Sequence, residues 1–276
     1  MSRDSASNTF LVAGAVCGVC ALLVSLTFVV LKPIQEQNKT LDIQRNILLA
    51  SAKDDAERAD FKKMSGEEVG QFFNENFEDM IIELQSGEDV SSDYPDEEAK
   101  AKYIQIEAAE LMKKGEYREI PDSEDLAKIK NQELRSHVYI RKAEDGKVER
   151  YIFPVRGKGL WSTLKGFIAL QSDLKTIAYL TYYSHGETPG LGGEVDNEGW
   201  KEQWDGKVVY DDGGDVAIRV VKGSASNEYQ VDGLSGATIT SRGVQNMLIY
   251  WMGPNGFGPF IKAQQKSGPS GVAAAQ

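Results

Sequence analysis

Hydrophobic positions gather at the start of the chain into one long uncharged segment. Residues 10–31 contain no Asp, Glu, Lys or Arg, and Gly14, Gly18, Ser25 and Thr27 are the breaks in the apolar run. As a helix rising ~1.5 Å per residue, the segment is about 33 Å long, enough to cross the hydrocarbon core of a bilayer. The pattern predicts a transmembrane helix after a short N-terminus of residues 1–9.

A cleaved signal peptide is the alternative interpretation of this segment. The run is too long for the hydrophobic region of a signal peptide, and no Ala-x-Ala site follows it, so we expect an uncleaved anchor. Arg3 precedes the anchor, whereas Lys32, Lys39 and Arg45 follow it. The positive-inside rule alone would therefore place the large domain in the cytoplasm.

After the anchor, helical spacing continues. Ile43, Ile47 and Leu48 predict that a helix continues or resumes, and Ser65 with Glu68 forms a capping box. An amphipathic helix is expected there, with the apolar stripe Val69, Phe72, Phe73, Phe77, Met80, Ile81 and Leu84.

Turn-forming and polar residues separate the remaining elements. Residues 87–98 are acidic and predict a surface loop, residues 107–114 predict a helix that ends at Gly115, and residues 263–276 predict a flexible tail. Residues 32–149 are thus expected to be helical first and to end in a hairpin.

Alternating patterns then predict strands. Residues 138–142 and 148–153 flank Asp145-Gly146, a hairpin signal. Further strands are expected at 163–170, 176–184, 208–210, 216–221 and 228–231. Helices followed by antiparallel strands indicate an α+β fold: a transmembrane helix, then a globular domain with an antiparallel sheet and flanking helices.

Charge and cysteine content narrow the function. The 42 acidic residues against 31 basic ones, a formal charge of −11, argue against nucleic-acid binding. The only cysteines, Cys17 and Cys20, lie inside the anchor at i and i+3. We interpret them as small apolar residues of a membrane helix. The alternative is that they bind an iron–sulfur cluster shared with a neighbouring subunit. No metal site is expected in the large domain.

The segment Asp232–Thr238, with the sequence DGLSGAT, carries the most chemical information. Gly236 and Ala237 leave room for a ligand close to the backbone, while Ser235, Thr238 and Thr240 offer hydroxyl groups. The segment is neither a P-loop nor a dinucleotide fingerprint, because it has no Lys after the glycines and no G-x-G-x-x-G.

An amphipathic helix is expected directly after this segment. Its stripe is Val244, Met247, Leu248 and Trp251, and it ends at Gly253-Pro254. Thr240 or Ser241 would cap it, so that its N-terminus could bind an anion. A plain capped turn without any ligand explains the same pattern.

The segment resembles the flavinylation motif of the FMN-binding domain family, Asp-x-x-Ser-Gly-Ala-Thr. Residues 157–161 (GKGLW) and 185–192 (HGETPGLG) resemble two further blocks of that family, and residues 243–245 and 251–260 resemble the C subunits of sodium-translocating NADH:quinone reductases. The similarity is clear over about residues 150–262, where we expect the FMN-binding domain.

This resemblance implies a function and a location. It implies a single-pass protein of the bacterial inner membrane, with FMN joined to Thr238 by a phosphoester and electrons relayed within a sodium-pumping complex. It implies a periplasmic domain, opposite to the charge rule, and it implies the other subunits and a flavin transferase as partners. A flavin that relays electrons needs no catalytic acid or base from the protein.

The resemblance and the residue types together select the candidate flavin contacts. They are Ser235, Gly236, Ala237, Thr240, Glu187, Thr188, Leu191, Gly192, Trp161 and Lys222, with Asp232 expected to act in recognition by the transferase. Within the 187–192 loop, Pro189 stiffens the chain and Leu191 offers an apolar face for a ring.

Other interpretations stay open at this point. His137 and His185 are the only histidines and are read as structural, since neither has a nucleophile partner. The corresponding flavin subunit of the Rnf electron-transport complex is one alternative function. A non-redox membrane-tethered domain, in which residues 235–238 form only a turn, is another.

Overall fold

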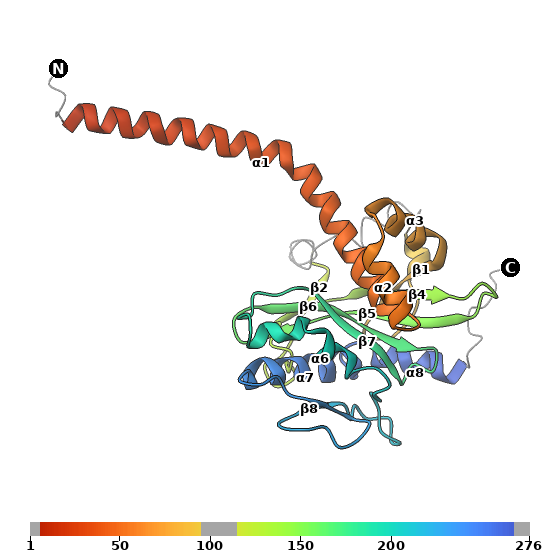
Figure 1. Cartoon of the computed structure of the whole chain (residues 1–276). Coiled ribbons are helices and arrows are strands. Elements are labelled where there is room, and N and C mark those ends of the chain that lie inside the picture. The colour runs from red at the N-terminus through yellow and green to blue at the C-terminus, as the bar shows by residue number, and fades with distance from the viewer. Residues whose placement is uncertain (1–5, 95–114, 268–276) are drawn as a thin grey trace. The chain divides into compact units, whose positions relative to one another are not determined.

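The computed structural model describes residues 6–94 and 115–267 (Figure 1). Residues up to Asp42 form one compact unit and residues from Ile43 onward form a second. The helix expected at 107–114 lies outside the described residues.

Helix α1 (Ala6–Ser51) contains the predicted anchor and continues without a break past Pro33. It is long and apolar enough to cross a membrane, and its apolar side chains are exposed, Phe10 by 79% and Leu22 by 73%. Its last residues are instead buried, since Ile47 and Leu48 belong to the core of the second unit. The predicted continuation of the helix is confirmed.

Helices α2 (Asp55–Lys63) and α3 (Gly66–Asn76) follow, and Ser65 and Glu68 form the predicted capping box. The predicted helix was too long, however, because β1 (Phe77–Glu83) begins directly after α3. Ile81 and Ile82 are both fully buried, so this strand has apolar residues on both faces. Such a strand lacks the alternation that would distinguish it from a buried helix.

The main sheet is antiparallel, in the order β1-β4-β5-β6-β7, as the α+β prediction requires. Its other strands are β4 (Arg135–Lys142), β5 (Val148–Lys158), β6 (Thr163–Gln171) and β7 (Ile177–Ser184). The predicted hairpin joins β4 to β5, and Gly146 has the positive φ of 79° that its turn requires.

Two smaller sheets accompany the main sheet, and one of them is parallel where antiparallel strands were expected. Strands β2 (Tyr117–Glu119) and β3 (Asn131–Glu133) are antiparallel, but β8 (Arg219–Val221) and β9 (Gln230–Asp232) are parallel. The loop between β8 and β9 folds back on β9, because the backbone N–H groups of Ala225 and Ser226 donate to the side chains of Asp232 and Gln230. Residues 208–210 form only isolated bridges.

Short helices complete the described part of the chain. Tyr94 follows η1 (Ser91–Asp93) in the acidic loop, and η2 (Gly192–Asp196) leads into α6 (Glu198–Glu202). Helix α8 (Gly258–Ser267) includes the first residues of the predicted flexible tail, so that prediction began too early.

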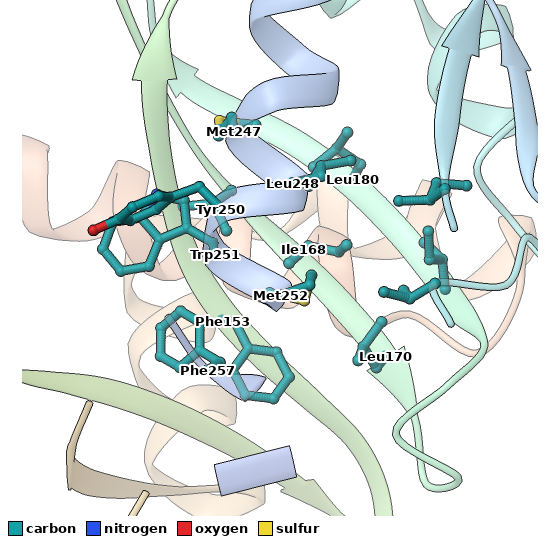
Figure 2. Close-up of a cluster of buried hydrophobic side chains, with 14 of the residues drawn as sticks. Phe153, Ile168, Leu170, Leu180, Met247, Leu248, Tyr250, Trp251, Met252 and Phe257 are labelled. Carbon is teal, nitrogen blue, oxygen red and sulfur yellow. The ribbon is translucent and has the colours of Figure 1, made fainter. Parts of the chain in front are cut away.

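The sheet is covered on both faces (Figure 1). Helices α7 (Thr238–Met252) and α8 cover one face, and the end of α1 packs on the other through Ile47 and Ala50. Figure 2 shows side chains of α7 gathered with those of the strands and with Phe257, which directly precedes α8; they include Met247, Leu248, Met252, Phe153, Ile168, Leu170 and Leu180. A Cβ on Gly243 would lie 2.3 Å from the Lys158 carbonyl oxygen, so only glycine lets α7 lie this close to the end of β5.

Candidate functional site

The turn from β9 into α7 contains one residue in the left-handed backbone region. Gly236 has a φ of 71°, and the helix begins at Thr238 with Ala237 as its N-cap. Ala237 offers no side-chain cap, so the first N–H groups of α7 are not satisfied from that residue. The positive end of the helix dipole therefore faces this turn.

The predicted caps, Thr240 and Ser241, lie inside the first turn of α7 instead. Thr240 Oγ1 donates a 2.7 Å hydrogen bond to Glu187 Oε2, and Ser241 Oγ accepts one of 2.9 Å from the Leu234 N–H. The capping prediction was wrong because the helix already begins at Thr238, and both hydroxyl groups are engaged in other hydrogen bonds.

Burial separates the hydroxyl groups of this region into two kinds. Thr240 is 0% exposed and Ser241 is 6% exposed, whereas Ser235 and Thr238 are exposed. Only the exposed pair can be reached by an external reagent without opening the fold.

A pocket of about 550 Å³ lies at this helix end. Its lining brings together five predicted residues: Lys222, Asp232, Ser235, Gly236 and Thr238. The 232–238 segment, the end of β8 and the first turns of α7 thus form one site.

Arg242 also lines this pocket and was missed by the sequence analysis. It follows Thr238 by four residues on α7, the spacing that places two side chains on one helix face, and this spacing was the available signal. Within the described residues neither Lys222 nor Arg242 takes part in an ion pair, so both cations are available to an anion.

Asp232 is held by the structure around the pocket. Its Oδ1 accepts a 2.6 Å hydrogen bond from the Ala225 N–H, and its carbonyl accepts one of 2.8 Å from Trp200 Nε1. The carboxylate therefore anchors the loop after β8 as well as lining the pocket.

Glu187 is the centre of a second, closed part of the site, which we term the Glu187 junction. The residue is 5% exposed. Its carboxylate accepts hydrogen bonds from the N–H groups of Leu160 (3.1 Å), Trp161 (2.9 Å) and Ser162 (3.0 Å), and from Thr240 Oγ1. It thereby joins the β5–β6 turn to the first turn of α7.

The electrostatics of the junction follow from these contacts. Burial raises the pKa of the Glu187 carboxyl, but the hydrogen bonds from Thr240 and from the backbone of Ser162, Trp161 and Leu160 outweigh burial and hold the pKa below its usual value. Glu187 is an ionised structural clamp.

The remaining predicted residues surround the junction. Trp161 is 66% exposed and Leu191 is 45% exposed. A Cβ on Gly236 would lie 3.0 Å from Leu191 Cδ2, so Leu191 packs beside the turn that leads to Thr238. Thr188 is exposed, and its carbonyl accepts hydrogen bonds from the Leu191 and Gly193 N–H groups. Gly192 and Ala237 are buried.

The histidines and cysteines do not line the pocket at Thr238. His185 Nε2 lies 2.7 Å from Asp196 Oδ2, and its Nδ1 accepts from the Glu187 N–H, so it connects β7 to η2. His137 is buried and stacks on Tyr139. Cys17 and Cys20 are free thiols on α1. Among the described residues, no group of three or more His, Cys, Asp or Glu could hold a metal ion.

A known protein family matches the part of the chain that holds this geometry. The model of the FMN-binding domain matches residues 159–253, which include the Glu187 junction and the pocket at Thr238.

Similarity to individual proteins covers nearly the whole chain. The chain is 42% identical over 270 residues to the C subunit of the Na(+)-translocating NADH-quinone reductase of Pseudomonas aeruginosa, covering 96% of this chain and 98% of that protein. It is 39% identical to the corresponding protein of Yersinia pestis, covering 95% and 94%.

Solved structures agree with the fold. The crystal structure of Shewanella oneidensis NqrC matches with a TM-score of 0.70 and 31% identity, over 83% of this chain and 98% of that one. The crystal structure of the C subunit of the Na(+)-translocating NADH-quinone reductase from Parabacteroides distasonis matches with a TM-score of 0.61 and 27% identity, over 85% and 98%.

Proposed function

Because the chain belongs to the family of C subunits of the Na+-translocating NADH-quinone reductases, we propose that it carries FMN on Thr238 through a phosphoester bond and relays electrons within such a complex. The observation that carries this proposal is the exposed Thr238 hydroxyl group at the first residue of α7, beside a pocket with two cations that form no ion pair with any described residue. Bound FMN would supply the redox chemistry, and the protein supplies its position and electrostatic environment.

Attachment itself is a balanced exchange of bonds. The Thr238 O–H bond would be replaced by an O–P bond to the flavin phosphate, with release of a proton and of the nucleotide that activates this phosphate on the transferase. The product is an anionic phosphodiester. The N-terminal end of α7, Lys222 and Arg242 fit this anion in charge.

Residues around the Glu187 junction fit the flavin ring. Trp161 and Leu191 present exposed apolar surface next to the turn that bears Thr238, and Thr188 offers a hydroxyl group for a polar edge. Glu187 acts through these neighbours, because its carboxylate fixes the Trp161 backbone and the first turn of α7. The site is thus supported by four buried residues that would not contact the ring directly: Glu187, Gly192, Ala237 and Thr240.

Asp232 acts in attachment. A carboxylate beside a phosphodiester repels it, so its presence in the pocket favours a role in recognition by the transferase, through the metal ion of that enzyme.

Helix α1 supports a location of this chemistry at a membrane. Helix α1 would cross the inner membrane with residues 1–9 in the cytoplasm and the FMN-binding domain in the periplasm, next to the other subunits of the complex. A covalent bond suits that compartment, since a reversibly bound cofactor would be lost to dilution there. The size of the domain weakens the opposing charge rule, which applies best to short loops.

The test is peptide mass mapping of the full chain, produced with a flavin transferase. We expect the mass of FMN on the peptide that contains Thr238. FMN found on Ser235 would show that Ser235, not Thr238, is the attachment residue. A colourless protein would favour the non-redox membrane-tethered domain.

Topology needs a separate measurement. Protease added to spheroplasts should digest the domain, and a phosphatase fused after Gln276 should be active. Protection of the domain would place it in the cytoplasm.

A further inference from the structure

A groove of about 240 Å³ lies outside the site described above and is strongly basic. Its lining includes Lys128, Lys130, Lys165 and Arg156. Arg156 donates to the one lining carboxylate, Glu133, while the three lysines form no ion pair with any described residue. In a chain with a formal charge of −11, such a concentration of positive charge needs an explanation.

The loop that presents two of these lysines has an unusual backbone. Lys128 has a φ of 54° and Lys130 a φ of 64°, in the left-handed region that costs a non-glycine residue about 1 kcal/mol or more. The buried carboxylate of Asp125 holds this conformation by accepting 2.9 Å hydrogen bonds from the N–H groups of Ile129 and Lys130. The fold therefore fixes both lysines at the mouth of the groove.

The groove adjoins the β5–β6 turn of the candidate flavin site. The Lys158 N–H donates to the Ala127 carbonyl at 2.8 Å, and Lys158 Nζ donates to the Trp161 carbonyl at 3.1 Å. Thr163, two residues after Trp161, also lines the groove. The basic loop and the exposed Trp161 are thus neighbours.

Exposed apolar side chains lie beside this groove. Four of them belong to the segments that meet at the Glu187 junction: Leu160 (42% exposed), Trp161 (66%), Leu191 (45%) and Ile239 (58%). Large apolar side chains that gather at one place on a surface mark interaction sites. An apolar centre with a charged rim is the usual composition of a protein–protein interface.

We propose that this apolar centre and the lysine groove form a docking surface for the acidic face of the protein that exchanges electrons with this domain. The inference rests on the proposed function for its account of why docking occurs here. The apolar centre favours a folded protein over a lipid headgroup, since lipid phosphates would need only the lysines. The basic rim would attract and orient a partner with carboxylates around its own apolar contact.

The test uses membranes that contain the assembled complex. A carbodiimide joins lysine amines to carboxylates in direct contact, and mass spectrometry then identifies the linked residues. We expect Lys128, Lys130 or Lys165 to be linked to Asp or Glu of a different polypeptide. Links only to a second copy of this chain, or no link from these lysines, would overturn the proposal.

Charge reversal provides the matched comparison. Lys128→Glu/Lys130→Glu should remove these links and slow quinone reduction about tenfold at low salt, with the difference narrowing as salt is added. Lys262→Glu/Lys266→Glu changes the net charge equally, at exposed positions of α8, and should leave both readouts as in the wild type. Equal effects of the two pairs would contradict a specific surface.

Two further readouts separate the possible failures. Flavin content should be normal in both variants, and a wild-type protein without flavin would overturn the proposed function while the cross-links still decide the docking surface. Binding of phosphatidylglycerol vesicles that Lys128→Glu/Lys130→Glu abolishes, in the absence of cross-links, would assign the lysines to lipid and overturn the docking surface.

Discussion

Thr238 and Thr240 lie two residues apart at the start of α7, yet they belong to different environments. The Thr238 side chain is exposed at a pocket lined by Lys222 and Arg242, whereas Thr240 is completely buried and donates to Glu187. Two similar hydroxyl groups at one helix start thus differ in accessibility. Thr238 is open to chemistry, whereas Thr240 belongs to the buried Glu187 junction, which holds the start of α7 in place.

The sharpest test of this contrast exchanges each hydroxyl group for a methyl group. Thr238→Val should abolish covalent flavin and leave stability within about 0.5 kcal/mol, because the side chain is exposed. Thr240→Val should keep the flavin and cost about 1 kcal/mol through the lost hydrogen bond to Glu187. In-gel flavin fluorescence and urea unfolding measure the two effects. Flavin retained in Thr238→Val would show that Thr238 is not the attachment residue.

The junction should be the more sensitive part for stability. Glu187→Ala leaves the N–H groups of Leu160, Trp161 and Ser162 without their acceptor, and we expect a loss of about 3 kcal/mol. Urea unfolding provides the measurement, with Leu191→Ala, an exposed position, as the control. Equal losses in both variants would show that the junction contributes no more than a surface contact.

Asp232 tests the pocket side without disturbing its backbone. Asp232→Asn keeps an oxygen that can accept from the Ala225 N–H but removes the charge, so flavin loading should fall severalfold while the fold is unchanged. Asp232→Ala should in addition loosen the 222–229 loop, which hydrogen exchange would detect. Full loading in Asp232→Asn would exclude a role for the charge in attachment.

Leu191 tests whether the ring lies at the boundary between the two parts. Leu191→Asp places a negative charge beside a flavin that gains negative charge on reduction, so reduction should become harder by on the order of 1 kcal/mol. The midpoint potential of the loaded protein should therefore fall, while Leu191→Asn should leave it nearly unchanged. A potential unaffected by the charge would place the ring away from the 187–192 loop.

The smallest expected effect is the pH dependence of the junction. The Glu187 pKa is lowered in the folded state, so its stabilising effect is complete above the unfolded pKa near 4.5 and is lost as pH falls through the folded value. Glu187→Gln should lack this acid-dependent loss between about pH 5 and pH 3. Identical acid unfolding curves of the two proteins, after correction for their difference at neutral pH, would contradict the lowered pKa.

Local signals in the sequence were sufficient for much of the fold. The uncharged 10–31 segment, the Ser65–Glu68 capping box and the Asp145-Gly146 hairpin all lie where predicted, because each depends on neighbouring residues. The helix predicted through Leu84 was too long, because residues 77–83 form a strand that is buried on both faces and shows no alternation.

The sequence selected several residues that line the candidate pocket, but not their arrangement. Ser235, Gly236, Thr238 and Lys222, all chosen from the sequence, line one pocket together with Arg242, which was missed; their contact with a flavin stays a prediction. The closed role of Glu187 could not be read from the sequence, because the groups that donate to its carboxylate are 25 to 53 residues away along the chain. The same distance explains why Thr240 was mistaken for a cap.

The order in which the sheet is assembled has a consequence for maturation. Strands β4 to β7 follow one another as neighbours, so they can pair early through contacts local in sequence. The surroundings of Thr238 instead combine the end of β8, the turn after β9 and the start of α7, and the Glu187 junction ties α7 to the β5–β6 turn. These parts come together only when the domain is complete. An unfinished chain would present Thr238 without this frame, so the fraction of molecules that carry flavin would report the fraction that has folded.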